Sequence, residues 1–171
     1  PVTLTVDGTN FIEGGLGSVV RWNGVNLATQ YVSPTQLTAT LTEVNIGSSG
    51  TAAVTVFNPA PGGGTSAEQQ FTVISPVPTT TTISPTTVTA GSSAFTLTVN
   101  GTNFIRNSVV QWNGSDRVTT YHSATQFTAV ITAADILSSS TAVVTVFNPT
   151  PGGGGSNPQM LNVPWPPPIV P

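Results

Sequence analysis

The chain has 171 residues, enough for one large domain or two small ones, and only 5% of them are charged, against roughly 25% in an ordinary globular protein. The net charge is −3 and lysine is absent, which argues against nucleic acid as a partner, because that binding depends on cations placed against phosphates. No apolar run approaches the roughly 20 residues that span a bilayer, and the absence of cysteine excludes disulfides and zinc thiolate sites, so we expect no membrane insertion and no such metal.

The first predicted strand lies in segment 3–12, Thr-Leu-Thr-Val-Asp-Gly-Thr-Asn-Phe-Ile, which returns almost unchanged at 96–105. In the second copy Phe95, Leu97 and Val99 alternate with polar residues, as in a half-buried strand. Both copies therefore open with a strand that has one face in a core.

Further strands follow in the same order in both copies. Ser18–Gly24 returns as Ser108–Gly114, where valine and tryptophan share one face and lead into Asn-Gly, a strong hairpin signal. Alternating apolar positions predict the remaining strands around residues 37–41 and 127–131, 54–56 and 144–146, and 71–73 and 161–163.

The internal repeat defines the domain organisation. About three positions in five are identical between residues 18–66 and 108–156. Six or seven short strands per copy, with at most one helical turn within 43–49 and 133–139, predict an all-β chain of two tandem Ig-like β-sandwiches. We expect domain 1 over residues 1–76, domain 2 over 77–164 and a proline-rich C-terminal extension over 165–171.

The ordered series Gly-x-Asn-Phe, Val-x-Trp-Asn-Gly, Val-x-Val-x-Asn-Pro, a Gly/Ser loop and Phe-x-Val resembles the IPT/TIG family of immunoglobulin-like domains over nearly the whole chain. The resemblance implies E-set-type sandwiches. It also implies a bacterial protein, extracellular or at the cell surface, because bacterial modules of this kind look like spacers and adhesive parts. That implication is an analogy between folds.

Nothing in the sequence indicates catalysis. The one histidine, His122, has Val32 at its counterpart and no nearby carboxylate to orient it. The six carboxylates are scattered, none forms a calcium loop, and the Pro-Gly-Gly-Gly loops lack the lysine of a phosphate-binding loop. We therefore expect no enzyme activity, no cofactor and no metal.

The aromatic residues divide into core candidates and one candidate anchor. Trp22 and Trp112 share a strand face with valine, which favours a core position over a sugar-stacking platform, and Phe11 and Phe104 are expected in the same cores. Trp165 lies among prolines and has no counterpart in the first copy. It is either a docking anchor or a residue packed on its own domain.

The two copies differ most at their starts. Before Phe95 the second copy has residues 79–91, which supply a first strand around Ile83 and Val88. The first copy begins with Pro1, aligned with Ala94, and has no such strand, while residues 164–171 extend beyond the second sandwich.

Two explanations of this mismatch stay open. One is truncation from a longer array. The other is head-to-tail strand donation, in which the tail of one subunit, with Trp165, Ile169 and Val170, pairs with the start of the next, at Pro1, Val2 and Leu4. The low charge favours assembly, and the missing lysine means that contacts are non-covalent rather than Lys–Asn isopeptide bonds.

Glycosylation has candidate sites of two kinds. Asn100 and Asn113 lie in Asn-x-Ser/Thr sequons. The proline-flanked threonines Thr79, Thr80, Thr81 and Thr82 are candidates for O-linked sugars.

Together these features predict a non-enzymatic extracellular structural protein, the subunit of a fibre or surface array that assembles head to tail with copies of itself. The alternative is an adhesive or spacer module of a larger secreted protein that binds glycans or a host.

Overall fold

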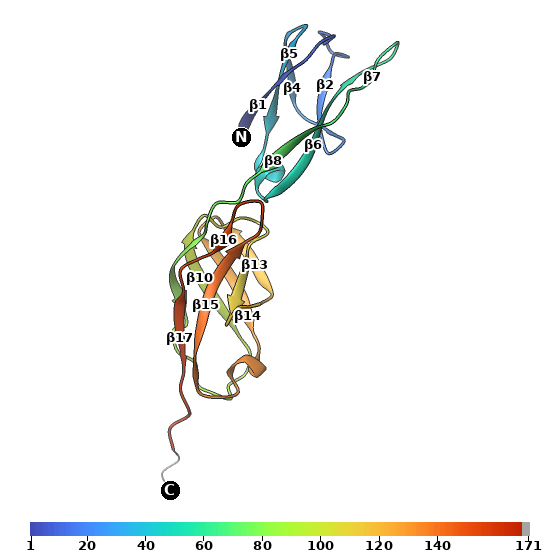
Figure 1. Ribbon diagram of the computed structural model, residues 1–171. Helices are drawn as coiled ribbons and strands as arrows, with labels where there is room; N and C mark the ends of the chain where they lie inside the picture. The colour runs from blue at the N-terminus through green and yellow to red at the C-terminus, as the bar shows by residue number, and fades with distance from the viewer. Residues whose placement is uncertain (169–171) are drawn as a thin grey trace. The chain divides into compact units, whose positions relative to one another are not determined.

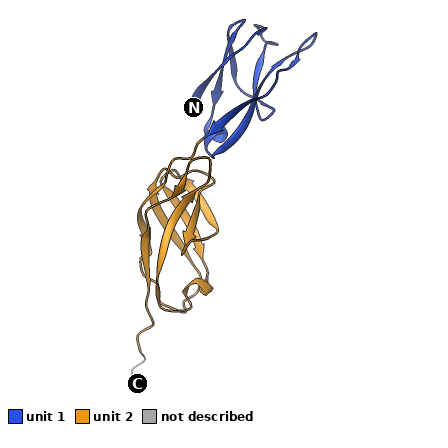
Figure 2. Ribbon diagram, viewed as in Figure 1, with its two compact units in different colours: residues 1–73 blue, residues 74–171 orange. Residues whose placement is uncertain are grey.

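The computed structural model describes residues 1–168 and forms two compact units, Pro1–Val73 and Ile74–Pro171 (Figure 2). The predicted all-β fold is confirmed, since helical structure within residues 1–168 is limited to α1 (Glu43–Ile46) and the 3₁₀ turn η1 (Ala133–Ile136). The unit boundary lies three residues before the predicted one, because the segment 74–77 hydrogen bonds to the second unit, for instance from the Ser75 N–H to the Pro151 carbonyl (2.8 Å).

Unit 1 is a sandwich of a three-stranded and a five-stranded sheet (Figure 1). The first sheet has the order β1-β5-β4; the second has β3-β2-β6, with β7 and β8 also paired to β6. The strands are β1 (Val2–Asp7), β2 (Val19–Trp22), β3 (Val25–Asn26), β4 (Thr29–Ser33), β5 (Gln36–Leu41), β6 (Gly50–Asn58), β7 (Gly64–Thr65) and β8 (Gln69–Val73).

Unit 2 repeats this arrangement with one strand more. Its first sheet has the order β13-β14-β10-β9; its second has β12-β11-β15, with β16 and β17 also paired to β15. The strands are β9 (Thr79–Ser84), β10 (Phe95–Thr102), β11 (Val109–Trp112), β12 (Ser115–Asp116), β13 (Thr119–Ser123), β14 (Gln126–Ile131), β15 (Ser140–Asn148), β16 (Gly154–Gly155) and β17 (Gln159–Val163).

The Asn-Gly pairs make tight hairpins in both units, as predicted. Asn23 and Gly24 have φ of 48° and 80°, and Asn113 and Gly114 have 50° and 80°. Positive φ at both central residues matches the twist of the flanking strands, which is why asparagine and glycine are favoured there.

The pairing registers are the same in the two units. Leu4 faces Ala39 across β1 and β5, and Leu97 faces Ala129 across β10 and β14. Because register decides which face each side chain takes, the two units direct equivalent residues into their cores. The difference between the units is therefore confined to what flanks this common framework.

Candidate functional site

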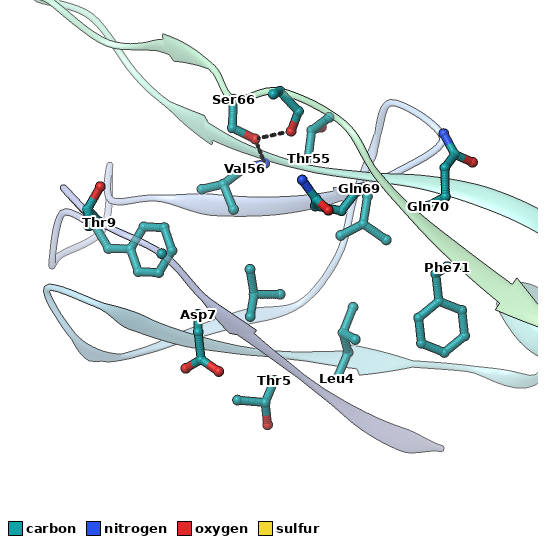
Figure 3. A pocket seen from close by; sticks show the side chains of 15 residues that line it. Leu4, Thr5, Asp7, Thr9, Thr55, Val56, Ser66, Gln69, Gln70 and Phe71 are labelled. Atoms are coloured by element: carbon teal, nitrogen blue, oxygen red, sulfur yellow. Dashed lines mark hydrogen bonds between the residues drawn. The ribbon is translucent and has the colours of Figure 1, made fainter.

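An open groove lies in unit 1 between β1 and β8, which belong to different sheets (Figure 3). Its volume is about 460 Å³, and Leu4 of β1 and Phe71 of β8 project into it. Ser66, Gln69 and other polar residues line its rim. Among the described residues, β1 pairs with β5 along one edge and with no strand along the other.

In unit 2 the equivalent position holds β9. This strand pairs antiparallel with β10, so that Ile83 faces Val99 and Ser84 faces Thr98. Ile83 is buried in the core of unit 2. After Pro85 the chain crosses to the other sheet, where the Val88 N–H donates to the Asn162 carbonyl of the β17 strand (3.0 Å). One segment thus closes both sheets on this side.

Thr80 fixes β9 at the rim of the sandwich. Its N–H donates to the Asn157 side-chain oxygen (2.9 Å), its hydroxyl donates to the Asn157 carbonyl (2.5 Å), and its carbonyl accepts from the amides of Asn157 (2.8 Å) and Gln159 (3.2 Å). Unit 1 has Ala67 and Gln69 at the two partner positions. It therefore keeps the Gln69 amide for an incoming carbonyl and lacks the asparagine side chain.

The core of unit 1 is less completely buried than that of unit 2. Leu97, Phe104 and Ile136 are fully or almost fully buried in unit 2. Their counterparts Leu4, Phe11 and Ile46 are only partly buried against the core of unit 1. Apolar side chains left in contact with water on an otherwise complete core favour the binding of an apolar partner.

The predicted core aromatics lie as follows. Trp22 and Trp112 are 7% and 3% exposed, so neither presents a face to a sugar. Phe104 stacks on Phe127 with ring centroids 4.8 Å apart, whereas Phe11 lines the open groove.

The residues predicted for assembly are divided between the two units. In unit 1, Leu4 lines the groove, while Pro1 and Val2 are exposed at the start of β1. In unit 2, Trp165 is 65% exposed. Ile169 and Val170 lie outside the described residues.

The glycosylation candidates differ in accessibility. Thr80 is buried and its hydroxyl is bonded, so it is not available to a sugar, whereas Thr81 and Thr82 are exposed on β9. The Asn100 side chain donates to Thr82 (3.1 Å) and accepts from Gln126 (3.0 Å). Asn113 is exposed but holds the hairpin by accepting from the Val143 N–H (2.8 Å).

The titratable groups do not gather into a reactive cluster. Within residues 1–168, no group of three or more His, Cys, Asp or Glu side chains is placed to hold a metal ion. His122 is hydrogen bonded to the Thr128 hydroxyl (2.9 Å) on β14. Asp135 pairs with Arg117 (2.5 Å), and although burial raises its pKa, the Arg117 guanidinium and the N–H and hydroxyl of Thr132 lower it further, to below the ordinary value.

Sequence reasoning missed the polar residues that fasten the first strand, namely Thr80, Asn157 and Gln159. The hydrogen bonds between them join residues nearly 80 positions apart, and no local sequence pattern predicts contacts over that distance. The one available signal is the contrast between the copies, in which Asn157 replaces Ala67 in a loop that is otherwise repeated.

Two sandwiches with Ig-like topology, one closed by its first strand and one open at that edge, define a tandem immunoglobulin-like protein. The IPT/TIG domain model matches residues 1–73 and 78–161, and the chain belongs to that family. The predicted family and fold are thereby confirmed.

Solved structures with similar folds come from several kinds of protein. The amphioxus IgVJ-C2 molecule has 15% identity and a TM-score of 0.39, over 95% of this chain and 96% of that one. The Bacteroides ovatus mixed-linkage glucan protein SGBP-B, solved with a heptasaccharide, has 13% identity and a TM-score of 0.37, over 94% of this chain and 40% of that one. The I9–I11 tandem of titin has 13% identity and a TM-score of 0.33, over 96% and 60%.

Likenesses at this level of identity and TM-score carry no argument about function. No curated protein matches the chain in sequence. Within the described part of the chain, no helix is long and apolar enough to cross a membrane.

Proposed function

We propose that the chain is a non-enzymatic structural link outside the cell, in a fibre or surface array whose units join end to end through the open side of unit 1. The observation that carries this proposal is the contrast between the two β1-type strands: β10 has a partner on each edge, whereas β1 has one on a single edge among the described residues.

An open edge of this kind is suited to assembly. An unpaired strand presents main-chain donors and acceptors to another chain, and an added strand satisfies them. Proteins that stay apart usually protect such edges with charge, especially lysine, yet this chain has no lysine and β1 carries only Asp7. The edge is thus poorly defended against pairing, which supports a role in joining units.

Head-to-tail joining is the simplest geometry for one open edge per chain. The donor suggested by the sequence is the C-terminal segment 165–171, including Ile169 and Val170, with Trp165 as its anchor. A contact between two different surfaces of identical subunits need not close on itself, so it generates an open filament. Because lysine is absent, the links are non-covalent, and dilution should dissolve them.

Sedimentation velocity and negative-stain microscopy over a hundredfold range of concentration test this function. We expect the sedimentation coefficient to rise with concentration and short filaments to appear. The variant Leu4→Asp, which places a charge in the groove, should stay monomeric, whereas Val118→Asp at a site that is 76% exposed in unit 2 should assemble normally. A chain that stays monomeric throughout would contradict self-assembly.

A variant that lacks residues 165–171 tests the donor. Loss of filaments would support donation by the tail, and unchanged filaments would assign the donor strand to another segment.

Glycan binding is a second candidate, favoured by the exposure of Trp165, which is 65% accessible on a proline-rich segment. Exposed aromatic rings can stack on sugars as they do on other flat apolar groups. Binding on a glycan array that is lost in Trp165→Ala but kept in Trp165→Phe would support this function, and an array without any binding would argue against it.

A further inference from the structure

The segment 74–77, which leads into β9, lies on a surface of unit 2 that we call the seat. The seat consists of the loop 149–153 and the side chains of Asn103 and Asn148. Ser75 is buried there, and three of its groups bond to the loop 149–153. Its N–H donates to the Pro151 carbonyl (2.8 Å), its hydroxyl donates to the Pro149 carbonyl (2.7 Å), and its carbonyl accepts from the Gly153 N–H (2.8 Å).

Two asparagine side chains extend the seat. Asn148, fully buried, donates to the Pro76 carbonyl (2.8 Å), and Asn103 donates to the Val77 carbonyl (3.0 Å). These bonds reach main-chain oxygens, so they hold the path of the segment and require no particular side chain at residues 76 and 77.

Unit 1 carries the same seat groups. The repeat places Asn10 and Asn58 at the positions of the two asparagines, and the loop Pro59–Gly63 at the position of the loop 149–153. The Asn58 amide donates to the Asn10 carbonyl (2.8 Å), which matches the bond from Asn148 to Asn103 (2.8 Å). The bond between the two asparagines is therefore already formed in unit 1. The loop backbone differs at one position, because Gly153 has a φ of 71° and its counterpart Gly63 does not have a positive φ.

Glycine positions indicate that the space above this seat is open in unit 1. A methyl group built on Gly152 would collide with the Ile74 side chain and the Ser75 carbonyl, so that glycine lets the segment approach. A methyl group on Gly62, its counterpart, would meet nothing within 4 Å.

The open seat is continuous with the groove beside β1. A second hollow of about 320 Å³ is lined by Asn10, Asn58 and Gly62, and it shares Phe11, Val56 and Ser66 with the main groove. Seat and groove together follow the path that residues 74–84 take on unit 2.

Neither of the chain's own candidate segments suits this site well. Residues 79–84 are already bonded into unit 2 as β9. The segment 164–171 has proline at five of its eight positions, which removes most of the N–H donors that a strand needs, and it places Trp165 where the seat holds the small Ser75.

We propose that the open side of unit 1 binds an extended threonine-rich segment with the pattern of residues 74–90, supplied from outside residues 1–171. The proposal rests on the open edge of the proposed function, and it names a different strand for that edge from the C-terminal segment considered there. The segment runs antiparallel to β1, with its serine on the loop 59–63, its Thr80-type carbonyl on the Gln69 amide, and its isoleucine against Leu4 and Phe71.

Asp7 contributes selectivity at this site. In unit 2 the Asn100 amide donates to the Thr82 hydroxyl (3.1 Å). Unit 1 has Asp7 in place of Asn100, and a carboxylate accepts but does not donate when ionised. A hydroxyl donor is therefore favoured at the Thr82-type position, where an acidic residue would be repelled.

A synthetic peptide of residues 74–93, added to the full chain, tests the proposal directly. We expect saturable binding by fluorescence anisotropy of the labelled peptide and, by mass spectrometry, hydrogen exchange slowed about tenfold or more in fragments covering β1 and β8. The matched control peptide carries Ile83→Asp and should not bind. On the protein side, Gln69→Ala should weaken binding about tenfold, as expected for one lost hydrogen bond with its desolvation, and Gln30→Ala on β4 should leave it unchanged.

A variant with the segment tethered to the chain keeps the test decisive if the free peptide binds too weakly. A copy of residues 74–93 is placed before Pro1, which continues the repeat because Ala94 aligns with Pro1. Tethering raises the effective concentration to the millimolar range. Protection of β1 and β8 should then approach that of β10 and β17, and the same graft with Ile83→Asp should show none. Unchanged exchange with both the peptide and the graft would overturn the proposal.

These outcomes separate this proposal from self-assembly. A monomeric chain that binds the 74–93 peptide supports the proposal and contradicts the homopolymer. Filaments that are blocked by a peptide of residues 164–171, but not by residues 74–93, keep the homopolymer and overturn the proposal in favour of the tail. Filaments whose unit 2 exchanges β9 between copies would also overturn it.

Discussion

Unit 1 and unit 2 have nearly the same interior residues in the same strand register, yet they differ in how completely those residues are buried. Leu97 of β10 is fully buried, whereas its counterpart Leu4 of β1 lines an open groove. The side chains are identical, so the difference comes from the neighbour: β9 covers one side of unit 2, and no described strand covers that side of unit 1.

This comparison shows that β9 and the residues that follow it complete unit 2 at three places. β9 completes the edge of one sheet, the segment after Pro85 bonds to the other, and Ile83 fills the space between them. A sandwich that lacks such a strand keeps its fold while losing burial at several separate positions. The affinity that we propose for a strand on unit 1 should therefore be distributed over the groove, the rim and the seat.

The largest expected effect comes from opening unit 2 so that it resembles unit 1. Ile83→Asp places a charge in a buried position, and we expect unit 2 to lose about 4 kcal/mol or more of unfolding free energy. The measurement is urea unfolding, followed by hydrogen exchange of fragments from each unit. Val118→Asp, at a site that is 76% exposed, is the control and should cost little. If Ile83→Asp were equally mild, β9 would not be the element that distinguishes the units.

Matched truncations of one leucine measure the same contrast more finely. Leu97→Ala should cost about 3 kcal/mol, because it leaves a cavity in a closed core. Leu4→Ala should cost about 1 kcal/mol, because part of its surface is already in water. The same urea experiment gives both values, and equal losses would mean that the groove is closed in solution.

The equivalent asparagines Asn148, which is fully buried, and Asn58, which is partly buried, provide a test of the same contrast with polar side chains. Asn148 accepts from the Ser108 hydroxyl (2.5 Å) and donates to Pro76 and Asn103, whereas Asn58 accepts from Ser18 (2.5 Å) and donates to Asn10. Asn148→Ala should therefore cost about 2–3 kcal/mol, and Asn58→Ala about 1–2 kcal/mol. With the grafted segment in front of Pro1, the cost at Asn58 should rise toward that at Asn148, and a cost that stays constant would show that Asn58 does not hold the seat.

The fold was predictable because its information is local and repeated. Alternation in segments such as 95–99 gives the strands, Asn23-Gly24 gives a hairpin, and the repeat gives two sandwiches. The difference between the two copies at their starts was visible for the same reason, since the copies could be compared position by position.

The chemistry of the open side was not predictable in that way. The rim bonds join Thr80 to Asn157 across 77 positions, and the seat joins Ser75 to Pro149 across 74. Such hydrogen bonds depend on which loops lie side by side in the folded chain. Residue spacing in the sequence does not predict that arrangement. The exposure of Leu4 likewise depends on a neighbour and not on its own alternation pattern.

The smallest expected effect concerns the ion pair that unit 2 has and unit 1 lacks. Asp135 bonds to Arg117, and the counterparts in unit 1 are Asn45 and Leu27. Although burial opposes its ionisation, the guanidinium and Thr132 hold the pKa of Asp135 below its ordinary value of 3.8. A carboxyl whose folded pKa is lowered stabilises the fold above its unfolded pKa, and this stabilisation disappears as the pH falls through the folded pKa. Asp135→Asn should therefore cost unit 2 about 1 kcal/mol at pH 7 and progressively less below about pH 4.

Asn45 already caps α1 by accepting from the Thr42 N–H (2.8 Å), so Asn45→Asp in unit 1, with no arginine at position 27, should change little at either pH. Urea midpoints of both variants at pH 7 and pH 3 measure the contrast, and a pH-independent loss in Asp135→Asn would assign its role to capping alone.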